Sequence, residues 1–110
     1  MIEYYRKLKE NEKFFAKAFE IAEGIKKKAE KLFGDCEVFI VGSFARGEHR
    51  LNSDLDLLIV STKIPAKLNF EDYCKFVRDL TEDDRINIHL LSRERFEEMK
   101  RFYEPMIKIA

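Results

Sequence analysis

Hydrophobic and polar residues follow a helical period in some parts of this chain and a strand period in others. In residues 2–33, apolar side chains recur at steps of three and four, which predicts one long amphipathic helix. Its stripe consists of Phe15, Phe19, Ala22, Ile25, Ala29, Leu32 and Phe33. Shorter stretches with the same period predict helices over 69–80 and 93–103, the second with Ser92 as its N-cap.

Strand-like patterns separate these helices. Residues 36–41 and 55–60 are continuous runs rich in β-branched and aromatic side chains, and residues 85–91 alternate apolar with polar positions. Residues 106–110 form a tail or a short terminal strand. Together the elements predict a single α+β domain over residues 1–110, with a small mixed β-sheet and helices packed mainly on one face.

Composition narrows the classes of partner. The chain has 110 residues with 21 basic and 21 acidic side chains, so it has no net attraction for nucleic acid or acidic membranes. We find no signal peptide and no apolar run of membrane-spanning length, and we expect a cytoplasmic protein. Cys36 and Cys74 occupy apolar positions and are expected to be buried free thiols rather than a disulfide.

Candidate chemistry is concentrated in the polar turn between the first two predicted strands. Asp54 and Asp56 stand two residues apart at the start of a strand, so their carboxylates point the same way. Two adjacent carboxylates repel each other unless a cation lies between them, and Mg²⁺ is the hard cation that such a pair holds. The pair therefore predicts a magnesium site.

The same turn carries groups suited to phosphate. Gly42 permits close approach of the backbone, and the amide and hydroxyl of Ser43 can donate hydrogen bonds to phosphate oxygens. Arg46 is a candidate clamp for a terminal phosphate, and Ser53 is a further candidate for nucleotide contact. Singly these features are common in turns, but together they indicate a site for a Mg-nucleoside triphosphate.

The combination resembles the signature of a known superfamily. Gly42-Ser43, ten intervening residues and the Asp54-x-Asp56 pair are similar to the GS-x10-DxD signature of the nucleotidyltransferases related to DNA polymerase β. The longer run GSFARGEHRLNSDLDLLIV resembles the minimal nucleotidyltransferases, small proteins often encoded beside a HEPN-domain partner. The resemblance implies a nucleotidyltransferase fold, a triphosphate held by the serine and its loop, and up to two Mg²⁺ ions on the aspartates.

In that family a third carboxylate on a later strand completes the metal site. The matching slot in residues 85–91 falls on Asn87, whose amide carries no charge and cannot serve as a base. Asp83 and Asp84 lie just before the strand, and a shift of either into the slot would break its inside-outside alternation. We therefore expect Asn87 at a degenerate third catalytic position.

Three further residues near the candidate site, His49, Arg50 and His89, each allow two interpretations. His49 and Arg50 lie in the signature turn and are either phosphate contacts or solvent-exposed loop residues. His89 stands two residues beyond Asn87 on the same face of its strand, and either faces the metal site or is a hydrogen-bonded structural residue.

The resemblance implies transfer of a nucleoside monophosphate, AMP by preference, from Mg-ATP or another Mg-NTP to a hydroxyl of a partner protein. A HEPN-domain protein in a toxin-antitoxin pair is the expected partner, and nucleic acid is expected only as an acceptor. The alternatives are a module that binds Mg-nucleotide or a partner without turnover, because of Asn87, and an interaction protein with a vestigial site. A homo-oligomer also stays open.

Overall fold

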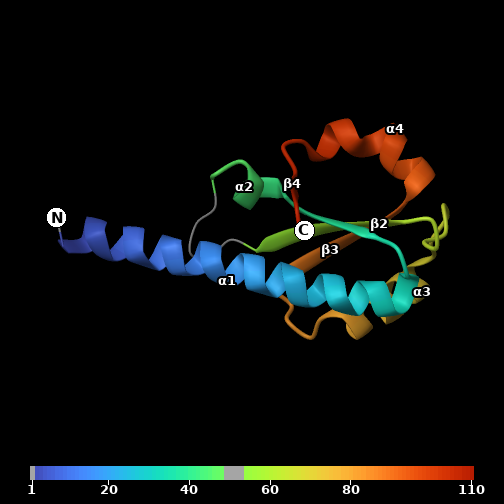
Figure 1. The fold of residues 1–110 in the computed structure, drawn as a ribbon, viewed down its shortest axis with the longest axis horizontal. Coiled ribbons are helices and arrows are strands. Elements are labelled where there is room, and N and C mark those ends of the chain that lie inside the picture. Colours follow the sequence, from blue (N-terminus) through green and yellow to red (C-terminus); the bar gives the residue numbers. More distant parts are fainter. Residues whose placement is uncertain (1, 49–53) are drawn as a thin grey trace.

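The computed structural model describes residues 2–48 and 54–110 and, near the N-terminus, the side chains of Arg6, Lys13 and residues 16 onward. Figure 1 shows helices alternating with short strands along the chain. The elements are α1 (Ile2–Phe33), β1 (Glu37–Val41), α2 (Gly42–Ala45), β2 (Leu55–Ser61), α3 (Phe70–Leu80), β3 (Ile86–Ser92), α4 (Arg93–Tyr103) and β4 (Ile107–Lys108).

The four described strands form one mixed sheet in the order β3-β2-β1-β4. Strand β1 pairs with β2 and with β4 in antiparallel fashion, whereas β2 and β3 run parallel. A parallel pair needs a crossover, which α3 supplies between β2 and β3. The predicted α+β fold with a mixed sheet is confirmed.

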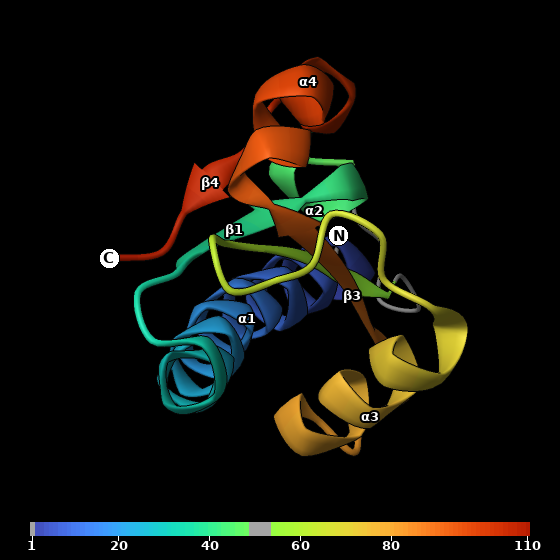
Figure 2. The same cartoon turned by 90° about the vertical axis from the view of Figure 1, so that its right-hand side faces the viewer.

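The sheet lies between two helical layers, with α1 and α3 on one face and α4 on the other (Figure 2). Successive side chains of a strand point to opposite faces, so Ile40 joins the core under α1 and Phe39 the core under α4. Both central strands are therefore apolar on both faces. This explains why residues 36–41 and 55–60 read as continuous apolar runs rather than as alternating ones.

Helix α1 packs on the sheet through a narrow stripe with alanine at several positions. Buried side chains recur at Ala18, Ala22, Ile25, Ala29 and Phe33, and the small alanines allow the helix to lie close to the strands. The side chain of Phe15, which the sequence places in the same stripe, lies outside the described residues. At the C-terminal end of α1, Phe33 packs edge to face on Phe76 of α3, with ring centroids 5.1 Å apart.

Helix caps fix where the two shorter helices begin. The side chains of Asn69 and Ser92 accept hydrogen bonds from the backbone of Asp72 and Arg95, respectively. Helix α3 therefore begins one residue after the predicted start, at Phe70. The N-cap predicted at Ser92 is confirmed.

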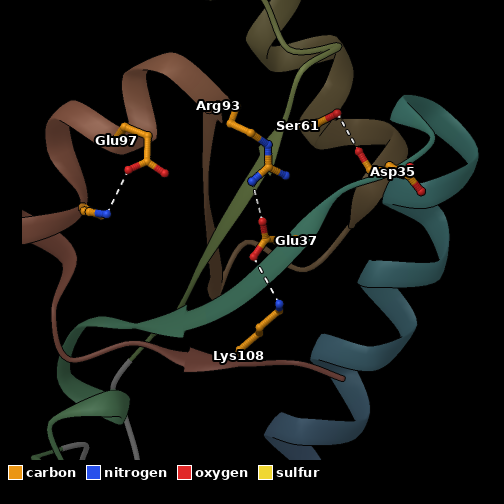
Figure 3. Close-up of polar contacts among 7 residues, drawn as sticks. Asp35, Glu37, Ser61, Arg93, Glu97 and Lys108 are labelled. Carbon is orange, nitrogen blue, oxygen red and sulfur yellow. Dashed lines mark hydrogen bonds and ion pairs between the residues drawn. The ribbon is translucent and has the colours of Figure 1, made fainter.

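Helix α4 is held on its face of the sheet by one ring stack and one charged cluster. Phe96 stacks on Phe39 with centroids 5.5 Å apart and an interplanar angle of 17°. At the first turn of α4, the Arg93 guanidinium donates to the Glu37 carboxylate, which also meets Lys108 Nζ at 3.3 Å (Figure 3). Because of these cations, chiefly the hydrogen bond from Arg93, the pKa of Glu37 lies below its usual range.

Two expectations from composition can be examined directly. Cys36 and Cys74 are both free and only partly buried, so the predicted free thiols are present but more exposed than expected. Burial, the largest effect, raises the pKa of the Cys36 thiol. No helix in the described part of the chain combines the length and the apolarity that crossing a membrane requires.

Candidate functional site

The candidate site residues meet at one edge of the sheet because of its topology. Strand β2 runs antiparallel to β1 and parallel to β3, so the end of β1 lies beside the starts of β2 and β3. The register pairs Asp56 of β2 with Val41 on one side and with Asn87 on the other. This edge therefore brings together Gly42, the two aspartates and Asn87, although they are far apart in sequence.

Gly42 and Asp56 are in the closest contact of this group. A Cβ atom built on Gly42 would lie only 2.3 Å from Asp56 Oδ2, a separation that real Cβ atoms do not show. Gly42 also has a φ of 72°, a left-handed conformation that favours glycine. The backbone of the turn thus passes directly over the Asp56 carboxylate. The predicted close approach of this backbone to phosphate stays a prediction.

Asn87 lies within reach of both aspartates. Its Nδ2 donates to Asp54 Oδ2 over 3.3 Å, and its Cα is the strand partner of Asp56. The register thus places Asn87 beside Asp56. Its assignment to the third catalytic position comes from the family resemblance and stays a prediction. The amide contributes a hydrogen-bond donor to the pair but no third negative charge.

Asp83, one of the two acidic residues just before β3, is paired with Arg85. Asp83 accepts hydrogen bonds from the backbone and the guanidinium of Arg85, and Arg85 is the main reason why the pKa of Asp83 is lowered. Among the side chains that the structure describes, no group of three or more His, Cys, Asp or Glu residues could hold a metal ion. The described donors at the site are two carboxylates and one amide.

The turn after β1 folds into the single helical turn α2, which begins at Gly42. The backbone amide of Glu48 donates to the Ser43 carbonyl over 2.9 Å, and the Gly47 amide donates to the Phe44 carbonyl over 3.1 Å. Ser43 is half-buried in this turn. Backbone hydrogen bonds within the turn therefore hold the segment that contains Ser43 and Arg46, two of the predicted phosphate-binding residues.

Arg46 is ion-paired in this structure. Its Nε lies 3.1 Å from Glu48 Oε2, and both side chains are well exposed. An exposed pair of this kind contributes little to stability, so the Arg46 side chain can exchange Glu48 for another anion. The sequence interpretation did not anticipate this pairing, although the spacing of two residues between opposite charges was a usable signal.

Of the remaining candidate residues, the structure describes only His89. Ser53, His49 and Arg50 lie outside the described residues. His89 is half-buried on the same side of β3 as Asn87, and its ring packs edge-on against Tyr103 with centroids 5.5 Å apart. His89 thus packs against α4. Both interpretations of this residue stay open.

Phe44 was missed by the sequence interpretation. Its side chain is 2% exposed, although its neighbours in the turn are polar or small. A large aromatic residue inside a polar, glycine-bounded turn was the signal that could have identified it as an anchor. Phe44 connects the turn to α1, where it meets Phe19.

Comparison with known proteins defines first the class of fold. The structure superimposes on a candidate nucleotidyltransferase from Sulfolobus solfataricus with a TM-score of 0.67, 23% identity, and coverage of 84% of this chain and 79% of that one. A second solved candidate nucleotidyltransferase gives a TM-score of 0.59 at 26% identity, covering 80% of this chain and 96% of that one. The fold is that of the nucleotidyltransferases.

The sequence then defines the family. Residues 22–110 match the nucleotidyltransferase domain model, and the chain belongs to this family. The resemblance first seen between Gly42 and Asp56 is thereby confirmed. The chain is also 36% identical over 61 residues to a protein adenylyltransferase, MntA, of Thermococcus cleftensis. This match covers 53% of the chain and 62% of that relative, so the chain spans less than two thirds of its length.

Proposed function

We propose that this edge of the sheet binds a Mg-nucleoside triphosphate, with Asp54 and Asp56 as the carboxylates that hold the metal. The donor set fits a hard cation because it offers two carboxylates, two residues apart at the start of β2, with the Asn87 amide beside them. The observation that carries the proposal is the contact between Gly42 and Asp56. The backbone at Gly42 lies so close to the Asp56 carboxylate that a side chain at position 42 would not fit.

The residues of the turn would orient the triphosphate. Ser43 offers its hydroxyl and its backbone amide, and the exposed Arg46 can exchange Glu48 for a phosphate oxygen. The bound metal ions would neutralise charge on the transferring phosphorus, as in other phosphoryl-transfer enzymes. Ser53, which the sequence also suggests as a nucleotide contact, belongs to the same proposal.

We further propose that the transferred group is AMP and that the acceptor is a hydroxyl of a partner protein. The phosphorus of the nucleotide would form a bond to the acceptor oxygen and release pyrophosphate, while the acceptor proton leaves to solvent. Support comes from the partial match to a relative that is named a protein adenylyltransferase. A HEPN-domain protein in a toxin-antitoxin pair is the acceptor that the sequence resemblance suggests.

The proposal is tested by titration calorimetry of ATP into the protein, with and without Mg²⁺. We expect binding that requires Mg²⁺ and that the Asp54→Asn/Asp56→Asn double variant loses. A matched control is Asp72→Asn/Asp79→Asn, which removes two exposed acidic side chains of α3 and should bind as the wild type does. Absence of Mg-ATP binding by the folded wild type, alone and with its partner, would refute the proposed function.

A second candidate function is a nucleotide-binding module without turnover, and Asn87 favours it. Asn87 occupies the strand position beside Asp56 where a third carboxylate would act on the attacking hydroxyl. Pyrophosphate release in the presence of Mg-ATP and the partner distinguishes the two functions. Tight binding with no release, and release gained in Asn87→Asp, would identify a binding module whose catalytic position is degenerate.

A further inference from the structure

The nucleotide-binding turn has one deeply buried anchor. Among residues 42–48, all of which the structure describes, Phe44 is the buried side chain, whereas the others are half-buried or exposed. Phe44 joins the core formed by α1, α3 and the sheet. The position of the turn relative to the strands therefore depends on how this one ring packs.

The ring of Phe44 packs edge to face against Phe19 of α1. The two ring centroids lie 6.2 Å apart and the ring planes are inclined by 76°, a favoured geometry for an aromatic pair. Phe19 itself remains 36% exposed and lies at the border of the core. It lies in α1 just before residues 22–110, the part that matches the family model.

Movement of Phe44 would be transmitted to the groups that meet the nucleotide. Phe44 directly follows Ser43, and its carbonyl accepts from the Gly47 amide, while the Ser43 carbonyl accepts from the Glu48 amide. These hydrogen bonds connect Ser43 and Phe44 to the end of the same turn. A shift of the buried ring would therefore displace the Ser43 hydroxyl and amide relative to the aspartate pair.

We propose that Phe19 is a positioning residue for nucleotide binding, which acts through Phe44 to hold the turn over Asp56. The inference rests on the proposed function, because it concerns the same site. Phe19 would not touch the nucleotide, and its ring would limit the freedom of the turn. An aromatic contact of this kind changes an equilibrium constant by about 3- to 10-fold. We therefore expect its loss to weaken the affinity for Mg-ATP by about 3- to 10-fold.

The experiment compares Phe19→Ala with Phe19→Leu and with a matched control, Phe76→Ala. Phe76 makes a similar edge-to-face contact with Phe33, at the C-terminal end of α1 and away from the turn. Two quantities are measured for each variant: the affinity for Mg-ATP by calorimetry, and hydrogen exchange of the amides of Gly47 and Glu48 without nucleotide. Thermal unfolding reports the general loss of stability.

We expect Phe19→Ala to bind Mg-ATP about 3- to 10-fold more weakly and to exchange both amides faster, with partial recovery in Phe19→Leu. Phe76→Ala should lower the unfolding temperature while leaving affinity and the two exchange rates near wild type. Wild-type affinity and exchange in Phe19→Ala would overturn the inference. Equal changes in Phe76→Ala would also overturn it, because they would show a general effect of instability.

Failure of the proposed function gives a different result. A wild type that binds no Mg-ATP, alone or with its partner, refutes nucleotide binding at this site. The exchange measurement needs no nucleotide, so it still decides whether Phe19 orders the turn. Unchanged exchange in Phe19→Ala then excludes the positioning contact independently.

Discussion

Substitution of Gly42 by alanine is the sharpest perturbation that the structure offers. The new Cβ would lie 2.3 Å from Asp56 Oδ2, so the carboxylate or the turn must move. The backbone at φ 72° adds strain of about 1 kcal/mol for a residue with a Cβ. An Asp56 side chain forced away from its preferred rotamer adds about 1 kcal/mol more, so Gly42→Ala should lose about 2 kcal/mol of stability.

Gly47→Ala is the matched control for this prediction. Gly47 has the same φ of 72°, but a Cβ atom built there meets no heavy atom of the described residues within 4 Å. It should therefore lose only the backbone contribution of about 1 kcal/mol. The difference between the two variants isolates the contact with Asp56.

Two assays check the prediction for Gly42→Ala. Urea unfolding measures the stability of both variants, and calorimetry measures their affinity for Mg-ATP. Under the proposed function Asp56 holds Mg²⁺, so its displacement should weaken Mg-dependent binding about 10- to 100-fold in Gly42→Ala, and far less in Gly47→Ala. Equal stability and equal affinity in the two variants would refute the argument that Gly42 is required by the position of Asp56.

Three further predictions concern the rest of the sheet. Asn87→Asp should raise the affinity for Mg²⁺ by about tenfold, because it adds a carboxylate beside the aspartate pair; unchanged affinity in a calorimetric titration would contradict this placement. Glu37→Gln should lose about 0.5–1 kcal/mol at neutral pH, since Arg93 lowers the pKa of the Glu37 carboxyl. The lowered pKa stabilises the fold above the ordinary value of about 4.3, and this stability is lost as pH falls through the folded-state pKa. The free energies of unfolding of the wild type and of Glu37→Gln, measured as a function of pH, should therefore become equal only at low pH. Tyr73→Phe should lose about 1 kcal/mol in urea unfolding, because its hydroxyl donates to the backbone carbonyl of Ile88; Phe70→Leu, at an exposed site of the same helix, should lose much less.

Local patterns determined most of the elements of this protein. Apolar residues at helical spacing define the helix over residues 2–33, and the β-branched and aromatic runs define the strands on either side of the turn. These signals are readable because the periodicity of side chains depends on neighbouring residues alone. Gly42-Ser43 and the aspartate pair are also readable from the sequence alone. The two aspartates stand two residues apart at the start of a strand, and this spacing fixes their common direction.

Only the tertiary structure decided which strands are neighbours and in what register. The sequence placed Asn87 in the third slot by its pattern, but its contact with Asp54 depends on the parallel pairing of β2 and β3. Likewise, the edge-to-face contact of Phe19 with Phe44 and the packing of α4 on the second face join residues that are distant in sequence. Such contacts follow from how whole faces pack together, because a local pattern shows which face is apolar but not what covers it.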